Sequence, residues 1–476
     1  NFATLTASVM GRKNAGQVSG LRSRAAAEFA IREPADLPGA DDAISTKAFA
    51  DLQPRCDTRT PGTKLDEVFK MKIRPALWLC LVFVLSAVTS GFAQEASASQ
   101  KPKLRGFTIV SPARDANGNM LKPAEASANS ALTTFNYTTV SSRDGNTYSG
   151  VMVGQDPFSS GPFTTTTVDT PIVPLIITTK SVAFKISSGG ILSRIKGFTT
   201  FDPTVADDAC LKSPNDVPLD VALQSPIFQA TDFSFGPTSV GTTQYIDAFQ
   251  RGNFSLQGTD YHTVLGPRVL RPVHLVFPAN EALAIPSGLF GSCGPLGIVN
   301  INTIYPVLLN LLAAEGFDSS QFPIFLMYNT VMSIGVPNNL NKCCILGFHD
   351  AVGSPIQTYS PLDFDTTGLF GPSIKDTSIA AHEVGEWMDD PFGNNPTPLW
   401  GHVGQVGGCQ DNLEVGDPLT GTNVPTVTSP VNGFDYHLQE LAFFSWFYGA
   451  PSIAVNGWFS DNNTFKHDAG PVCTKK

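Results

Sequence analysis

The segment His382-Glu383-Val384-Gly385-Glu386 has the residue types and the spacing of a metal-binding helix. Residues four apart on a helix lie on the same face, so His382 and Glu386 would point the same way and could hold one metal ion. Glu383 is turned by about 100° from His382 and could act as general base on a metal-bound water. This is the arrangement of the H-E-x-x-H zinc helix, with a glutamate in place of the second histidine.

A metal site on this helix needs a third protein ligand from elsewhere in the chain. Glu414 lies 28 residues after Glu386 and is the first candidate, because zinc sites of the His/His/Glu type take their last glutamate from a later segment. Asp390, near the end of the same helix, is the alternative ligand. Asp417 is a weaker alternative, or a hydrogen-bond partner of a ligand. The sequence therefore predicts His382, Glu386 and either Glu414 or Asp390 as metal ligands.

The charge around this segment also favours a bound cation. Between Asp350 and Asp461 the sequence has 14 acidic residues, one lysine and no arginine. These carboxylates must either spread over the surface or be neutralised by a metal ion. We expect Zn²⁺ from the helix pattern, with Ca²⁺ as the alternative because an oxygen-rich ligand set favours harder ions. The competing interpretation is an ordinary amphipathic helix whose carboxylates pair with backbone groups or water.

Three further residues are candidates for stabilising the transition state of a hydrolysis. His349 ends a predicted strand before the helix, and Tyr436 and His437 lie together beyond it. Each could donate a hydrogen bond to a developing oxyanion, and the alternative for each is a purely structural role. His402 is a candidate loop ligand. The sequence has no G-x-S-x-G, Walker A or G-x-G-x-x-G motif, so serine nucleophiles and nucleotide binding have no local support.

Residues 375–390 must form the helix that positions the motif. Three residues at its start can cap it: Asp376, Thr377 and Ser378. Pro391 follows its end. Gly385 is unfavourable inside a helix by about 1 kcal/mol relative to alanine. We therefore expect the backbone or a substrate to approach closely at Gly385.

The first half of the chain has the pattern of a β-rich lobe. β-branched and aromatic residues dominate over residues 131–200, with turn residues between the runs. Residues 201–265 mix loops with one expected helix around 243–249. We take 94–269 as the β-rich N-terminal lobe.

The second half mixes helices and strands. Residues 302–315 have helical apolar spacing, and residues 438–448 form an apolar and aromatic run that we expect to be a buried helix. Residues 323–332 and 343–349 are expected strands, and the first of them is a candidate edge strand that could pair with an extended peptide. We take 270–476 as an α/β C-terminal lobe. The whole is an α+β fold, and we do not expect the two lobes to fold separately.

The beginning of the sequence has the features of a secretory leader. Met71-Lys72-Ile73-Arg74 is followed by an apolar run to residue 88 and then by small residues. This pattern predicts a signal peptide over 71–93, and the alternative is a membrane anchor, for which the run is short. Residues 1–70 then form an upstream or disordered leader outside the fold. We expect a protein that is secreted, or periplasmic or extracellular, with no membrane segment after cleavage.

Composition limits the function further. The chain has 476 residues, a net charge of −10 and no cluster of basic residues past residue 110, which argues against nucleic acid as a partner. Six cysteines follow the predicted signal peptide: Cys210, Cys293, Cys343, Cys344, Cys409 and Cys473. An even number in an exported chain predicts up to three disulfides. Because Cys343 and Cys344 are adjacent, we expect them to pair with different partners.

Several motifs follow one another in the C-terminal half: Gly347-Phe348-His349, His382-Glu383-x-x-Glu386, Asp390-Pro391, Trp400 and Glu414-Val415-x-Asp417. This order resembles the exordium-like (phosphate-induced protein) family, whose members show a G-F-H segment, an H-E-L-A-E helix, N-P or D-P, a Trp and an E-I/N-x-D segment. The match covers 270–476 and is strongest over 347–418. The spacer between Pro391 and Glu414 is longer here than in the family, which leaves open the choice of third ligand.

The resemblance implies a secreted protein with a zincin-like H-E-x-x-E helix, and hence a zincin-like α/β C-terminal lobe around a central metal-binding helix. Our first hypothesis is a secreted metal-dependent hydrolase, most simply a zinc metallopeptidase with Glu383 as general base and a peptide or protein as substrate. The alternative is a non-catalytic secreted exordium-like protein. It would hold a structural metal and bind a cell-surface or wall polymer.

Overall fold

The computed structural model describes residues 104–468 and Cys473, with the exception of seven single positions: 116, 188, 208, 212, 214, 423 and 424. The described residues belong to one compact unit. The predicted leader over 1–70 and the predicted signal peptide over 71–93 lie outside the described residues. No helix in the described part of the chain is long and apolar enough to cross a membrane.

A closed barrel of seven strands forms the centre of the fold. The strand order is β14-β13-β11-β10-β4-β12-β15, and the barrel closes because β15 also pairs with β14. The strands are β4 (Thr165–Ile186), β10 (Ala282–Ile285), β11 (Leu296–Asn300), β12 (Ile324–Tyr328), β13 (Thr330–Ser333), β14 (Cys343–Val352) and β15 (Gln357–Phe364). Strands from both sides of residue 270 therefore belong to one barrel.

Because the barrel is closed, the prediction of an edge strand over residues 323–332 is wrong. We expected residues 323–332 to form an edge strand, but β12 pairs with β4 and β15, and β13 pairs with β11 and β14. The backbone hydrogen-bonding groups of both strands face neighbouring strands, so they have no free edge for an extended peptide.

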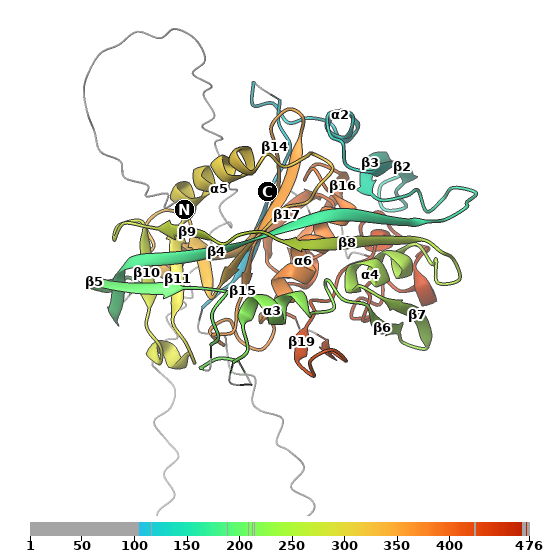
Figure 1. The fold of residues 1–476 in the computed structure, drawn as a ribbon. Coiled ribbons are helices and arrows are strands. Elements are labelled where there is room, and N and C mark those ends of the chain that lie inside the picture. The colour runs from blue at the N-terminus through green and yellow to red at the C-terminus, as the bar shows by residue number, and fades with distance from the viewer. Residues whose placement is uncertain are drawn as a thin grey trace, which may run out of the picture. The chain divides into compact units, whose positions relative to one another are not determined.

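Further strands extend or flank the barrel. The long strand β4 also pairs with β5 (Leu192–Phe201), β8 (His262–Val269) and β9 (Val273–Val276), which lie beside it in Figure 1. β1 (Phe107–Ser111) pairs with β14 in parallel. Four separate pairs are β2 (Thr134–Val140) with β3 (Thr147–Val153), β6 (Thr231–Phe235) with β7 (Thr238–Thr243), β16 (Pro396–Val403) with β17 (Val406–Asn412) and β18 (Thr426–Thr428) with β19 (Asp435–His437). The expected β-rich pattern over 131–200 is confirmed.

Helices are few. The α-helices are α2 (Pro123–Ala128), α3 (Pro218–Leu223), α4 (Tyr245–Asn253), α5 (Ile301–Glu315), α6 (Ser378–Asp389) and α7 (Phe444–Tyr448). Short 3₁₀ turns are η1 (Leu289–Gly291), η2 (Leu340–Lys342), η3 (Asp417–Leu419) and η4 (Val455–Gly457). Helix α5 ends at Gly316, whose φ of 64° needs a residue that tolerates the left-handed conformation. The mixed α+β class is therefore confirmed, with a β-rich core.

The last predicted helix is shorter than expected. We predicted a helix over 438–448, but α7 begins only at Phe444. The preceding backbone donates to tertiary partners instead: Leu438 N to Pro425 O, Leu441 N to the Asp461 carboxylate, and Ala442 N to Val415 O. Because these donors are already used, residues 438–443 run as an extended segment along the protein.

Helix α6 lies between the barrel wall and this extended segment. It contacts β14 and β15, and its apolar side chains join a hydrophobic cluster that includes Leu438 and Leu441. A Cβ atom at Gly385 would lie 2.5 Å from Leu441 Cδ1. The close approach expected at Gly385 is therefore made by the side chain of Leu441, from the extended segment. A second cluster joins the barrel strands to α5.

The six cysteines form three disulfides, Cys210–Cys293, Cys409–Cys473 and Cys343–Cys344. The expectation that Cys343 and Cys344 take different partners is wrong. The other four cysteines already form two pairs, with Cα atoms 5.3 and 5.7 Å apart, which leaves the adjacent residues to bond to each other.

Candidate metal centre

Five of the predicted residues meet in one buried cluster beside α6. The helix provides His382, Glu383 and Glu386, β14 provides His349, and the segment after β17 provides Glu414. All five side chains belong to residues that are at most 1% exposed. The cluster therefore draws on three separate parts of the chain.

Close packing between α6 and β14 explains how His349 reaches the helix. Gly347 lies two residues before His349, on the same side of the strand. A Cβ atom at Gly347 would lie 2.8 Å from Ile379 Cγ2 and 3.3 Å from Glu383 Cγ. A larger residue would push α6 away from the strand, so Gly347 allows the contact.

The cluster contains two sets of possible ligands. The His382 group consists of His382, Glu383 and Glu386, and the His349 group consists of His349, Glu386 and Glu414. Within each group, one ligand atom per residue lies within 4.8 Å of the others. Glu386 belongs to both groups.

Hydrogen bonds fix the orientation of the His382 ring. The Gln439 amide nitrogen donates to the Gly416 carbonyl at 2.6 Å, so the Gln439 oxygen must face His382 Nδ1, which is 3.1 Å away. An amide oxygen only accepts, and Nδ1 therefore carries a proton and donates it. The opposite nitrogen, Nε2, then points toward the carboxylates, as in metal-ligating histidines.

Three oxygen atoms surround His382 Nε2. Glu386 Oε1 lies at 2.9 Å, Asp417 Oδ1 at 3.4 Å and Thr108 Oγ1 at 2.7 Å. Gly416 packs on the ring, where a Cβ atom would lie 2.5 Å from Nδ1, so only glycine fits there. Once Nε2 gives up its proton, its lone pair among these oxygen ligands is a suitable environment for a divalent cation.

The His349 side of the cluster contains unpaired polar atoms. His349 Nδ1 lies 3.2 Å from Glu383 Oε2 and 3.7 Å from Glu386 Oε2. The remaining atoms, His349 Nε2 and Glu383 Oε1, are buried and make no hydrogen bond to any residue that the structure describes. Each such atom costs about 1–3 kcal/mol of desolvation, so two in one cluster point to a ligand that pairs with them.

The electrostatics agree with a missing positive charge. Burial raises the pKa of Glu383 and of Glu414 well above the usual range, and the charge of Glu386 raises both further. Burial lowers the pKa of His349 to about 3, so this imidazole is neutral and able to bind a metal. Burial alone would lower the pKa of His382, but the neighbouring Glu386 raises it well above its ordinary value. A divalent cation would satisfy these carboxylates without protonating them.

Amide groups orient the carboxylates from outside. Asn412 Nδ2 donates to Glu414 Oε1 at 2.6 Å. Asp417 accepts from the side-chain amides of Gln405 and Gln410. The backbone nitrogens of Gly416 and Asp417 both donate to Glu386 Oε1 at 3.2 Å. This surrounding shell resembles the outer partners that hold metal ligands in place.

Asp390, the alternative third ligand, belongs to neither group. Its carboxylate accepts hydrogen bonds from the backbone nitrogens of Asn394 and Asn395 in the turn that follows α6. Burial raises its pKa to about 8. The geometry thus brings Glu414 to His349 and Glu386 and engages Asp390 in the turn.

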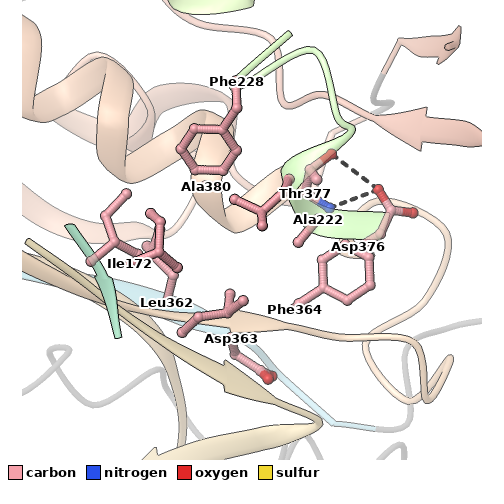
Figure 2. A pocket seen from close by; sticks show the side chains of 12 residues that line it. Ile172, Ala222, Phe228, Leu362, Asp363, Phe364, Asp376, Thr377 and Ala380 are labelled. Carbon is pink, nitrogen blue, oxygen red and sulfur yellow. Dashed lines mark hydrogen bonds between the residues drawn. The ribbon is translucent and has the colours of Figure 1, made fainter. Parts of the chain in front are cut away.

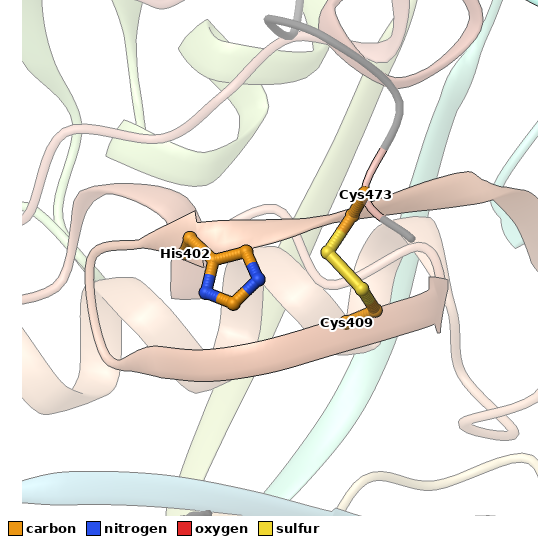
Figure 3. Close-up of side chains that lie close together, drawn as sticks. All are labelled: His402, Cys409 and Cys473. Atoms are coloured by element: carbon orange, nitrogen blue, oxygen red, sulfur yellow. A yellow bond between two sulfur atoms is a disulfide. The ribbon is translucent and has the colours of Figure 1, made fainter. Parts of the chain in front are cut away.

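Tyr436 and His437 also stand outside both groups. The Tyr436 hydroxyl donates to the Val221 carbonyl at 2.6 Å, and His437 Nδ1 lies 2.7 Å from Asp376 Oδ2. His402 lies beside the Cys409–Cys473 disulfide on the β16–β17 hairpin (Figure 3). Because both sulfurs are in a disulfide, this trio offers no thiolate to a metal.

Two residues at the centre escaped the sequence reasoning. Thr108 lies in a segment with no motif, and it reaches His382 only because β1 pairs with β14. Gln439 lies in the run that we predicted as helix. The role of Gln439 depends on an extended segment beside α6. The apolar periodicity of the sequence predicts a helix there instead.

An apolar pocket adjoins the first turn of α6. Figure 2 shows Phe228, Leu362 and Ala380 among the side chains that line it. Asp376 lies in the same wall and accepts hydrogen bonds from Thr377. Ala380 precedes Glu383 by three residues, so the two are neighbours on the helix surface.

Comparison with family models, with curated proteins and with solved structures finds no match for this chain. The resemblance to the exordium-like family, the export of the protein and the identity of the metal therefore stay predictions.

Proposed function

We propose that this chain is a metal-dependent hydrolase with its centre on α6. The observation that carries the proposal is the orientation of His382, whose Nδ1 is engaged by Gln439 while Nε2 faces Glu386 and Asp417. In this proposal His382 and Glu386 hold the ion, and Glu414 joins them from the His349 side of Glu386. Zn²⁺ is the first expectation for the metal and Ca²⁺ the alternative. A bound Zn²⁺ would polarise the substrate carbonyl and acidify a water molecule.

Glu383 is the general base of the proposed reaction. Its Oε1 has no hydrogen-bond partner, and its Oε2 is held 3.2 Å from His349 Nδ1. An oriented carboxylate with a raised pKa can take a proton from the attacking water and pass it to the leaving group. His349 positions Glu383 in this scheme. The zincin-like character of this part of the chain is part of the proposal.

The pocket beside α6 supports a substrate with an apolar side chain. It is lined by aliphatic and aromatic groups such as Phe228 and Leu362, and it lies one helical turn from Glu383. Such a pocket would select an apolar residue of a peptide or protein next to the bond that is cleaved. In this proposal recognition depends on the pocket, because β12 and β13 have no free edge.

A second candidate function is favoured by the burial of the cluster. All five His and Glu residues are at most 1% exposed, which suits a closed structural site as well as a catalytic one. The chain would then be a non-catalytic, secreted, exordium-like protein that binds an extracellular polymer. In this candidate Glu383 has no chemical role.

Glu383→Gln separates the two candidates. In the hydrolase, the variant keeps its metal and loses peptide hydrolysis by about 10²–10⁴-fold. Glu440→Gln is the matched control, because Glu440 is an equally buried glutamate that bonds to Thr464 outside the cluster. Hydrolysis by Glu383→Gln at the wild-type rate would contradict the mechanism. A metal-loaded wild type that cleaves no peptide would favour the structural candidate.

A further inference from the structure

The two oxygens of Glu386 face different histidines. Oε1 lies 2.9 Å from His382 Nε2, and Oε2 lies 3.7 Å from His349 Nδ1. Glu386 is also the residue that the His382 group and the His349 group share. A carboxylate with one oxygen directed to each of two ligand sets is arranged to bridge two ions, as in dinuclear carboxylate proteins.

Each histidine has a carboxylate of its own besides Glu386. Glu414 belongs to the His349 group, and Glu383 belongs to the His382 group. Asp417 adds an oxygen 3.4 Å from His382 Nε2. With Glu383 kept as general base, two imidazoles and the carboxylates of Glu386, Glu414 and Asp417 still exceed what one tetrahedral ion uses, and they are enough for two ions that share a bridge.

A fully ionised set of carboxylates would accommodate the same count. The four carboxylates carry four negative charges when ionised, whereas one divalent cation neutralises only two. The remaining two would stay in a region where the residues that bear them are at most 5% exposed, and buried unpaired charge is costly. Two divalent cations would balance the set.

The unpaired atoms are an independent observation. His349 Nε2 and Glu383 Oε1 are buried without a hydrogen-bond partner among the described residues. Glu383 contacts His349 and belongs to the group of His382, so it lies between the two sets. An ion at the His382 group alone leaves the His349 group without a cation.

We propose that this centre binds two divalent cations, one in the His382 group and one in the His349 group, with Glu386 as the bridging ligand. The inference rests on the proposed metal-dependent function and deepens it. Two ions on either side of one carboxylate could together hold the attacking water and polarise the carbonyl oxygen of the bond that is cleaved. Mixed imidazole and carboxylate ligands suit Zn²⁺ and Mn²⁺.

The test is a metal titration of the full chain after removal of metal with a chelator. Zn²⁺ is added under equilibrium dialysis, and bound zinc per chain is measured by elemental analysis. The wild type should bind two ions, and His349→Ala should bind one. His402→Ala is the control, because His402 lies beside a disulfide outside the cluster, and it should bind two.

Each result has a distinct meaning. One ion in the wild type, unchanged in His349→Ala, overturns the two-ion inference and leaves the proposed function standing. Failure of the wild type to bind any ion overturns both. If His349→Ala does not fold, Glu414→Gln replaces it, since this change keeps the side-chain shape.

A second measurement needs no variant. The wild type loaded with Mn²⁺ should give the electron paramagnetic resonance spectrum of two coupled ions at about 3.5–4 Å. The spectrum of isolated Mn²⁺ at full loading contradicts the inference.

Discussion

The two faces of β14 carry buried ionisable groups that differ in their hydrogen bonding. His349 faces α6 and meets carboxylates with unpaired atoms, whereas Asp350, the next residue, points to the other side of the strand. Asp350 accepts from the hydroxyls of Tyr305 and Tyr359 at 2.9 and 2.8 Å and from the Ala351 nitrogen at 2.7 Å. Both faces are equally buried.

Burial therefore does not distinguish a structural carboxylate from a metal ligand. Burial raises the pKa of Asp350 to about 6, and hydrogen bonds from the two tyrosines limit the shift. Burial raises the pKa of Glu383 well above the usual range, and the nearby Glu386 raises it further. The complete hydrogen-bond network of Asp350 is typical of a structural residue. The incomplete network of Glu383 is typical of a residue in a site.

The largest expected effect comes from His382→Ala. The change removes the oriented nitrogen of the His382 group, so the ion of this group should be lost. For a ligand at 1,000 times its Kd, the stabilisation lost is about 4 kcal/mol. Thermal unfolding with and without chelator checks this: wild type should shift strongly, and His382→Ala should shift far less. An equal shift in both would place the metal elsewhere.

Gln439→Met tests whether the orientation of His382 matters. Loss of the acceptor for Nδ1 frees the ring, and loss of such an outer partner typically costs 10–100-fold in metal affinity, about 1.4–2.7 kcal/mol. Competition with a chromogenic chelator measures the affinity. Gln244→Met is the matched control, because Gln244 is a buried glutamine that bonds to the backbone of Leu265. If both variants bind metal as wild type does, Gln439 has no positioning role.

Asp350→Asn tests whether the Asp350 face of β14 contributes to stability but not to metal binding. The amide nitrogen would face the hydroxyls of Tyr305 and Tyr359, and the mismatch should lower the free energy of unfolding by about 1–3 kcal/mol. Metal content should stay at the wild-type level. Urea unfolding and elemental analysis measure the two quantities. Loss of metal in Asp350→Asn would show that the two faces are not independent.

The pH dependence should be the smallest effect. Burial raises the pKa of Asp389 to about 7 and that of Asp461 to about 8. Carboxyls with a raised pKa hold protons in the folded state that the unfolded state has released, so stability falls as pH rises toward these values. Between pH 6.5 and 8 these two groups should lower the free energy of unfolding by about 2 kcal/mol. Urea titrations at both pH values check it, and a rise would contradict the assignment.

The core of the site could be predicted because its geometry is local. His382, Glu383 and Glu386 follow from the repeat of one helix, and the helix boundaries follow from Pro391 and the apolar spacing. Glu414 was reached by analogy with zinc sites, and the structure brings it to His349 and Glu386. The β-rich pattern over 131–200 was readable for the same reason, since strand periodicity is also local.

The remaining features depend on long-range pairing. Barrel closure requires β14 to pair with β15, and Thr108 reaches His382 only through the pairing of β1 with β14. The apolar neighbours of Gln439 predict a helix. In the structure, backbone N–H groups of this segment instead donate to residues outside it. Such contacts leave no trace in a single sequence, because local propensity is a weak guide where tertiary packing decides.

The metal content of the full chain, purified without chelator, tests the central claim most directly. Elemental analysis of the wild type beside His382→Ala should find at least one divalent transition metal per chain in the wild type and at least one ion fewer in the variant. Metal-free wild type that is folded and stays metal-free after incubation with Zn²⁺ and Mn²⁺ would contradict the account. The cluster on α6 would then be a polar part of the core.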